Sequence, residues 1–505
     1  MTIALAWFTL TSSGVAQLGP PASSSQGSTA AQLPLSGRSG QNGTVAATQS
    51  AVPGTTTSVN TLNPSIQVQG PFTGSVSGPP FSGKLSLQDA IQRGLRYNLG
   101  AVSLSQAAQQ IHGQNRVARS ALMPNVNGTL AETVEQLNLQ ANGVRIKSPI
   151  PGFGVPSIVG PFNFFDLRAR LSQSVVDFTA WNNYRSSSDL ARASLLSMRD
   201  ARDLVVLAVG GAYLQVIAAG ARVQSARVQL KTATALYEQT SQQRKAGLLA
   251  QIDVDRSEVQ MLTQKQRLVS LQNDLAKQKI NLARLTGLPP TDEYEISDDI
   301  PYSSAQPMTF ADAMQQALAQ RSDLKASEAQ IRAAEHALAA ARDERLPSLA
   351  LAGDYGVIGT NPAQSHGTFS VSGTLRVPIW QGGRAEGDIE QAHAALGQRR
   401  AELDDLKSEI QAEVRSAYLD LEAAASQVEV ARRNVQVNQE SLDLTRQRFE
   451  AGVTDSVEVV QAQASLASAD LDYINSVFAH NLAKLSLARA TGSAADHLTE
   501  FLKMP

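Results

Sequence analysis

The sequence has no cysteine, only six histidines, and few aromatic residues, which make up 5% of its 505 residues. Without cysteine the chain cannot form disulfides, zinc–thiolate sites, a thiol nucleophile or a lipid-modified N-terminal cysteine. The histidines are scattered without ligand spacing, and neither a phosphate-binding glycine loop nor a catalytic triad pattern occurs. We therefore predict no metal site, no cofactor, no catalytic residues and no enzymatic activity.

The chain also lacks an excess of charge of one sign, because its formal net charge is −2. Proteins that bind nucleic acid usually carry a basic stripe, so we predict no nucleic-acid partner. The low aromatic content, together with abundant alanine, glutamine and leucine, is typical of long helices and not of a large aromatic core.

Long apolar runs are scarce too. We predict no membrane-spanning helix, since such a helix needs roughly 18–20 consecutive apolar residues. If the protein crosses a membrane, it must use β-strands closed into a barrel, the other structure that satisfies every backbone group in lipid.

The N-terminal region divides into two parts. Residues 3–10 are apolar and small residues follow at 14–16, which predicts a signal peptide over residues 1–16, although no basic residue precedes it. A mis-assigned start or a disordered tail is the alternative. Residues 17–83 are rich in serine, glycine, threonine and proline and almost uncharged, so we predict a disordered leader.

The rest of the chain is a duplication. Residues 86–91 resemble residues 309–314, residues 246–247 resemble 451–452, and residues 283–287 resemble 488–492. These matches predict one repeat at 84–288 and a second at 309–495, each beginning with a helix capped by serine or threonine. An acidic, proline-rich connector at 289–308 separates the repeats, and residues 496–505 form a C-terminal tail.

Each repeat contains a predicted β-hairpin, at about residues 123–177 and 346–380, because apolar and polar residues alternate there. Four strands cannot close a barrel, so several chains must share one, unless the strands form a small soluble sheet packed on helices. In a shared barrel the apolar face would meet lipid and the polar face would line a wet lumen. The predicted lumen residues are Asp166, Arg168, Arg170 and Arg376.

Long helices are expected on either side of the hairpins. No proline lies between Pro161 and Pro289, or between Pro378 and Pro505. Apolar residues recur at spacings of four and three, which predicts coiled-coil pairs that reverse at glycines and place two turns at a far tip. A soluble coiled-coil tether is the alternative, but it leaves the hairpins unexplained. The predicted tip residues are Ala246, Gly247, Leu248, Ala451, Gly452 and Val453.

Over residues 84–495 the chain resembles the TolC family of outer-membrane efflux proteins. Residues 171–177 and 377–383 resemble the family's strand-to-helix junctions, residues 448–460 its periplasmic turn, and residues 488–492 its closing segment. The resemblance implies a mainly α fold with a small β part. Long antiparallel coiled-coil helices would form an α-barrel, and the four strands of each chain would contribute to a shared 12-stranded transmembrane β-barrel of a homotrimer.

The resemblance also implies a function and partners. The trimer would be a passive exit duct in the outer membrane of a diderm bacterium, extending into the periplasm and exporting small molecules such as drugs and toxic compounds. A periplasmic adaptor protein would contact the tips and link the duct to an inner-membrane pump or a secretion ATPase, while outer-membrane lipid would surround the barrel. Type I protein secretion and metal-ion efflux are alternatives within the channel class.

The resemblance further implies a ring of acidic residues at the closed pore entrance. The first matching position is Glu458, the second is Gln461, which is not acidic, and Asp455 could partly replace it. Glu458 could instead be a solvated residue near a helix start. Thr454 stands where the family has a basic residue. Asp253 is the first-repeat counterpart of Glu458, and a helix-cap role is expected for it.

Overall fold

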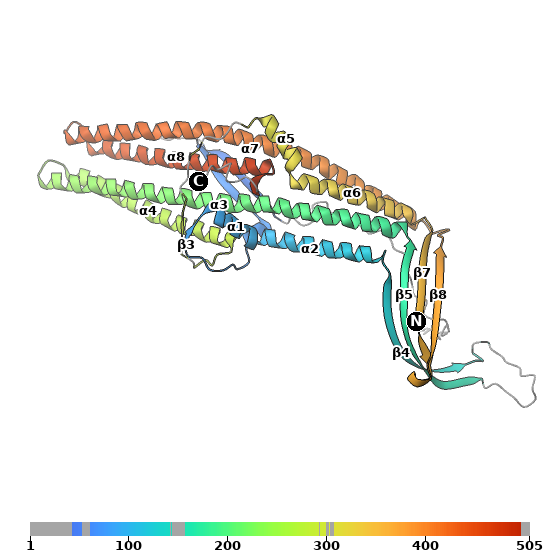
Figure 1. Cartoon of the computed structure of the whole chain (residues 1–505). Coiled ribbons are helices and arrows are strands. Elements are labelled where there is room, and N and C mark those ends of the chain that lie inside the picture. The colour runs from blue at the N-terminus through green and yellow to red at the C-terminus, as the bar shows by residue number, and fades with distance from the viewer. Residues whose placement is uncertain are drawn as a thin grey trace, which may run out of the picture.

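The computed structural model describes residues 43–52, 61–141, 143, 157–291, 293–298, 302–303 and 308–495. The molecule is elongated, with a bundle of long helices at one end and a narrow sheet at the other (Figure 1). The predicted signal peptide at 1–16 and the tail at 496–505 lie outside the described residues.

The two repeats have the same order of elements, as the duplication predicted. The first contains α1 (Leu87–Tyr97), α2 (Leu99–Ser120), α3 (Phe178–Lys245) and α4 (Gln251–Thr286). The second contains α5 (Phe310–Gln320), α6 (Ser322–Asp343), α7 (Arg384–Glu450) and α8 (Ser456–Ala490). The predicted caps are confirmed: Ser86 accepts a hydrogen bond from the Asp89 amide and Thr309 accepts one from the Asp312 amide.

Helices α3 and α7 give the molecule its length. They contain 68 and 67 residues, so each is on the order of 100 Å long at about 1.5 Å per residue. Helix α4 returns along α3, and α8 returns along α7. The predicted antiparallel helix hairpins are therefore confirmed.

The two hairpins form one antiparallel sheet in the order β4-β5-β7-β8. Its strands are β4 (Asn125–Asn138), β5 (Ile158–Val176), β7 (Ser348–Gly359) and β8 (His366–Arg376), and the short 3-10 helix η2 (Pro362–Gln364) connects the last two. The sheet stands at the end of the helices instead of packing on them (Figure 1). The alternative of a small soluble sheet packed on helices is therefore wrong.

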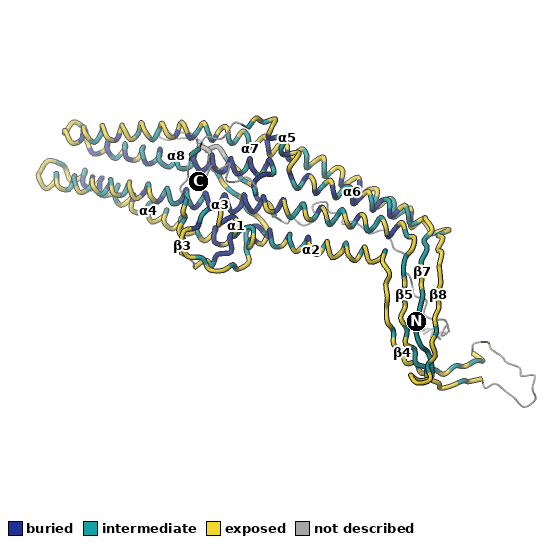
Figure 2. The backbone as a smooth tube through the Cα atoms, in the orientation of Figure 1, coloured by how far each residue is buried: buried dark blue, intermediate teal, exposed yellow. Residues whose placement is uncertain are grey.

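The main hydrophobic core lies midway along the helices, in a region that we call the waist. Its buried side chains come from α1, the middle of α3, the end of α4 and the end of α8, and they include Tyr213, Leu285 and Leu482. A neighbouring cluster joins α5, α7 and the last turn of α8. Burial is concentrated at the waist and along helix contacts, whereas the sheet is largely exposed (Figure 2).

The prediction of a disordered leader over residues 17–83 is wrong for its described part. Strand β1 (Val45–Val52) pairs with β2 (Thr61–Val68), followed by the 3-10 helix η1 (Gly70–Thr73) and β3 (Gly83–Leu85). Alternating apolar residues, with Val45 and Ala47 on one strand and Ile66 and Val68 on the other, pack against the core. The prediction from composition failed here because the apolar side chains of the segment pack against a core that the helices form.

The connector also contains a strand, β6 (Tyr294–Ile296), which pairs in parallel with β3. Its Asp298 is not simply solvated, since its carboxylate accepts hydrogen bonds from the Leu87 amide and the Tyr213 hydroxyl. Burial and this carboxylate raise the pKa of Tyr213 above its ordinary value. The connector thus links the start of α1 to the middle of α3 at the waist.

Among the described residues one helix, α3, is long and apolar enough by length and composition to cross a membrane, so the sequence does contain an apolar run of the required length. Residues 204–221 of α3 contain no charged side chain. The apolar window is 78% buried inside the protein, so it serves as the central core helix of the waist.

Candidate channel entrance and lumen

Both predicted tip turns lie at the end of the molecule farthest from the sheet (Figure 1). Gly247 and Gly452 adopt left-handed conformations with φ of +75° and +71°. The amides of Leu248 and Val453 donate back to Gln243 O and Arg448 O, the pattern of a Schellman helix end. The side chains of Leu248 and Val453 are 74% and 68% exposed, so each turn presents one apolar side chain outward.

Glu458 lies in the first turn of α8, where its carboxylate faces a basic partner. Its Oε2 atom lies 3.6 Å from a guanidinium nitrogen of Arg448, at the end of α7, and both side chains are about half exposed. The amide of Glu458 and that of Val457 donate to Asp455 Oδ1, so Asp455 is the N-cap of α8. Gln461 is exposed one turn further on.

The helix-cap role expected for Asp253 is wrong, because the N-cap of α4 is Ala250, which makes no side-chain cap bond. The Asp253 carboxylate instead accepts a 2.9 Å hydrogen bond from Ser456 Oγ, in the first turn of α8. It also lies 3.8 Å from Arg256. The first-repeat carboxylate thus links the two helix hairpins, whereas its counterpart Glu458 pairs within its own hairpin.

An apolar cluster holds the hairpins together just behind the turns. Leu236 of α3 is buried with Leu442 and Phe449 of α7 and Val459 of α8. Deeper along the first hairpin, Thr240 and Ser257 share a buried hydroxyl–hydroxyl hydrogen bond of 2.6 Å. Thr454, the position of the expected basic lock, is partly buried, and its hydroxyl has no partner among the described residues.

The sheet separates its side chains into two faces by register. Asp166, Arg168 and Arg170 point to one face of β5, opposite Ile358, Gly356 and Asp354 of β7. Arg168 Nε donates to Asp166 Oδ1 at 2.6 Å, and a second guanidinium nitrogen lies 3.6 Å from Asp354. Asp354 lies on the same polar face, although it was not among the predicted lumen residues. It stands in the alternating run of β7 and could have been found there.

Arg376 belongs to the same face of the sheet but not to this cluster. It ends β8 opposite Ser348, close to the helices. By alternation it shares its face with Thr374, Ser372 and Ser370, and the Ser370 hydroxyl donates to Asp354 at 3.1 Å. The polar face therefore extends along the whole sheet.

The opposite face is apolar and open. It includes side chains from all four strands, and these remain exposed although the residues are among the most apolar of the chain. Tyr355, Phe369 and Val371 are more than 70% exposed. Exposed apolar patches of this extent mark a surface that is covered in the native environment. Further members of this face are Val126, Leu130, Leu167, Leu351 and Leu375.

A buried charge cluster at the waist is a feature that the sequence reading missed. Arg321, at the junction of α5 and α6, is 2% exposed and forms ion pairs with Asp323 and with Glu413 of α7. Arg489 of α8 pairs with Asp200 of α3 at 2.7 Å and lies 4.0 Å from Asp323. The cluster joins four helices from both repeats. No local sequence motif predicts this charge cluster, because most of its residues are far apart in the sequence.

The ion pairs at the waist shift the acid–base behaviour of their members. Burial by itself lowers the pKa of Arg321, but its hydrogen bonds and proximity to Asp323 and Glu413 outweigh burial and raise it. Burial by itself raises the pKa of Asp323. The hydrogen bond from Arg321 and the charges of Arg321 and Arg489 outweigh burial, so the pKa lies below its ordinary value. Both groups are charged at neutral pH.

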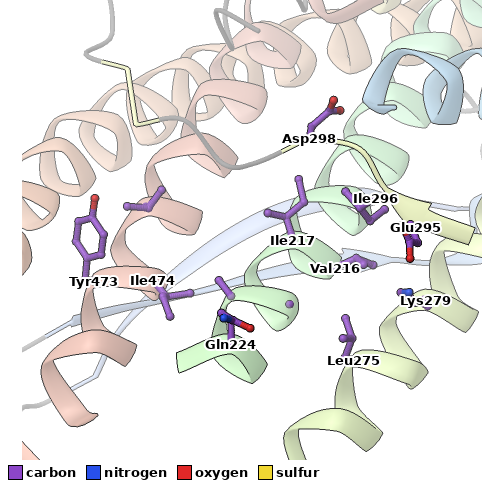
Figure 3. A pocket seen from close by; sticks show the side chains of 13 residues that line it. Val216, Ile217, Gln224, Leu275, Lys279, Glu295, Ile296, Asp298, Tyr473 and Ile474 are labelled. Carbon is purple, nitrogen blue, oxygen red and sulfur yellow. The ribbon is translucent and has the colours of Figure 1, made fainter. Parts of the chain in front are cut away.

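A cavity of about 550 Å³ lies between α3, α4, α8 and β6, with an apolar lining that includes Ile217, Leu275 and Ile474 (Figure 3). Two of its polar lining residues, Lys279 and Asp298, are already engaged. Lys279 Nζ donates to Tyr294 O, and Asp298 accepts the bonds described above.

Comparison with known proteins gives a consistent result. The family model described as outer membrane efflux protein matches residues 100–288 and 313–493. Outer membrane efflux protein BepC of Brucella suis is 24% identical over 84% of this chain and 90% of its own. Outer membrane protein TolC of Escherichia coli is 22% identical over 78% of this chain and 84% of its own.

Solved structures support the same fold. The Campylobacter jejuni CmeC outer membrane channel has a TM-score of 0.68 with 17% sequence identity. The match covers 83% of this chain and 89% of the CmeC chain. At this identity the likeness establishes the fold, including the long helix hairpins and the strands.

Proposed function

The chain belongs to the outer membrane efflux protein family, and on this premise we propose that three copies assemble into one passive exit duct. The resemblance read from the sequence is thereby confirmed. The protein is an efflux protein of the outer membrane that extends into the periplasm, and it is not an enzyme. The trimer, its entrance and its contacts are the proposed part.

The sheet is the observation that carries the proposal. One of its faces is apolar and exposed, the other is polar and charged, and its outer strands β4 and β8 are unpaired at their edges. Unpaired edges are excluded in lipid, because each free amide and carbonyl costs several kcal/mol there. Three sheets joined edge to edge would close a 12-stranded barrel with the apolar face outward and the lumen lined by Asp166, Arg168, Arg170 and Arg376.

The surfaces of the helices also support the proposal that several copies of the chain assemble side by side. Taken over their whole length, α3 packs on α4 and α8, and α8 packs on α7, so α4 and α7 are the outer helices of the wall. Each carries an exposed apolar stripe with heptad spacing, the pattern of a coiled-coil seam. In a ring of three chains, α7 of one copy would pack on α4 of the next. The stripes consist of Ile252, Val259, Leu262 and Val269 on α4, and Val430, Val437 and Leu444 on α7.

The partners follow from the position of the tip. A periplasmic adaptor protein would contact the two turns, where Leu248 and Val453 offer exposed apolar side chains. An inner-membrane pump would supply the energy, because a passive duct has none. The family and its relatives favour efflux of small molecules over protein secretion or metal export. The soluble tether is not favoured, since it leaves the apolar face of the sheet in water.

Glu458 is the proposed entrance residue. Three copies of its carboxylate around the axis would attract cations and repel anions, while Arg448 limits this field through the 3.6 Å contact. Asp455 contributes by capping α8 and fixing the direction of the first turn. Asp253 would instead hold the two hairpins of one chain together through Ser456.

Single-channel current in planar bilayers tests this function. We expect small, discrete conductance from the purified protein, and a reduced cation preference and weaker block by divalent cations in Glu458→Ala. Glu386→Ala is the matched control, since Glu386 is also exposed and paired with an arginine but lies at the other end of α7. A protein that never conducts would refute the duct, whereas equal selectivity in both variants would remove only the entrance role.

A further inference from the structure

Residues 43–52 and 61–78 lie outside the region that matches the family model, and yet they contact both repeats. Strands β1 and β2 cross α3 of the first repeat and α8 of the second, and they appear as blue ribbons behind these helices in Figure 1. We name the described part of this segment, residues 43–52 and 61–78, the strap. Its position raises the question of what it holds.

The strap is fixed to α8 and α3 by specific contacts. Gln49 Nε2 donates a 3.0 Å hydrogen bond to Ala479 O of α8. Ile66 rests on Gly211 of α3, where an added Cβ would come within 2.3 Å of Ile66 Cδ1. The same glycine also lies close to Leu482 of α8, so the strap covers the line along which the two helices meet.

The other end of the strap is fixed to the first repeat. Phe72 is completely buried against Gly100 of α2, and Asn98 Nδ2 donates to Phe72 O at 2.9 Å. Ser75 Oγ donates to Arg284 O at the end of α4. Because this end is fixed to the first repeat, any sliding of α8 along α3 must break the hydrogen bond between Gln49 and Ala479 O.

We propose that the strap ties α8 to the first repeat at the waist and restrains the movement of the α7–α8 hairpin that opens the tip. This inference rests on the proposed duct, and it adds that the tip opens when the two hairpins of each chain move apart. The strap would keep the closed state favoured until a partner at the tips supplies the opposing free energy.

A size exchange at the Ile66–Gly211 contact tests the proposal. Gly211→Ala places a methyl group against Ile66 Cδ1 and should lift the strap, whereas Gly211→Ala with Ile66→Val removes that atom and should reseat it. Gln49→Ala removes the contact to α8 by an independent route. Thr48→Ala is the control, because its exposed hydroxyl shares a hydrogen bond with Ser65 across the ribbon and none with a helix of the described structure.

Two measurements distinguish a failure of the strap proposal from a failure of the duct proposal. Spin labels on Leu248→Cys and Val453→Cys report distances at the tip, and the absence of natural cysteine keeps the labelling specific. Single-channel current reports the open fraction. We expect Gly211→Ala and Gln49→Ala to widen the distance distribution and raise the open fraction about fivefold, the effect of one ordinary hydrogen bond on a two-state equilibrium.

The double variant and Thr48→Ala should behave like the unmodified protein. Unchanged tip distances in both single variants would overturn the strap, and so would a double variant that stays as altered as Gly211→Ala, because the effect would then come from α3 itself. If no form of the protein conducts, the duct fails, while the distances still decide about the strap.

Discussion

The waist and the tip hold their charges in opposite ways. At the waist Arg321 and Asp200 are each 2% exposed and ion-paired, whereas at the tip Glu458 and Arg448 are 51% and 56% exposed. An ion pair that is shielded from water must stay intact, because one partner left alone keeps the cost of burial. An exposed pair contributes little to stability, so its charges are available for the proposed role of Glu458 at the channel entrance.

This difference suggests a division of labour along the helices. The waist fixes how the two repeats meet, through hydrophobic packing and charges that cannot be separated cheaply. The tip keeps only a small apolar cluster around Phe449 and a few polar links such as Asp253 to Ser456. A region that must change its shape has to be held by weak contacts, so the tip is the expected moving part.

The largest effect is expected from breaking the waist. Arg321→Met keeps the aliphatic stem but leaves the carboxylates of Asp323 and Glu413 without their partner. We expect the free energy of unfolding to fall by about 3–5 kcal/mol. Arg400→Met is the control, since Arg400 forms an exposed pair with Glu335 and its loss should cost at most about 1 kcal/mol. Chemical denaturation of both variants measures the comparison, and equal losses would contradict it.

The waist should also make stability depend on pH. Burial, and then the nearby Lys484, lower the pKa of His480 to about 4, and its ring lies against Tyr302 with no hydrogen-bond partner among the described residues. Because the folded pKa lies below the unfolded value of 6.5, the unfolded state binds more protons between pH 6.5 and 4. Stability should therefore fall as the pH falls through this window, by about 3 kcal/mol at its lower end.

His480→Leu should flatten this dependence and leave stability at pH 7.5 nearly unchanged, since no hydrogen bond is lost within the described structure. His393→Leu, at an exposed position of α7, should keep the slope of the unmodified protein. Thermal unfolding midpoints measured from pH 7.5 to 4 would show the difference. An unaltered slope in His480→Leu would contradict the assignment.

The smallest effect is expected at the tip, where the two turns differ in their caps. Asp455 caps α8, whereas Ala250 offers α4 no side-chain acceptor. Asp455→Ala should destabilise the first turn of α8 by about 1 kcal/mol, and Ala250→Asp should stabilise that of α4 by a similar amount. Hydrogen exchange of the amides of Val457 and Glu458 reports the first change. Exchange that stays the same in Asp455→Ala would show that the cap is not what holds this turn.

The sequence by itself determined the features that depend on local pattern. Duplicated segments predicted two repeats, alternation predicted the strands and their two faces, and Gly247 and Gly452 predicted the turns, because a left-handed residue is needed there. The charged face with Asp166, Arg168 and Arg170 followed from the same alternation. Each of these depends on neighbours in the chain, which the sequence displays directly.

Only the tertiary structure decided which distant residues meet. It joined Arg321 to Glu413, gave Asp253 a partner on the other hairpin in place of a cap, and buried the apolar part of α3 at the waist. It also placed strands and a 3-10 helix in residues 43–52 and 61–85, although the composition of this region predicted disorder. That segment has too few apolar residues to form a hydrophobic core of its own. It becomes ordered because its apolar side chains pack against the core that α3 and α8 form.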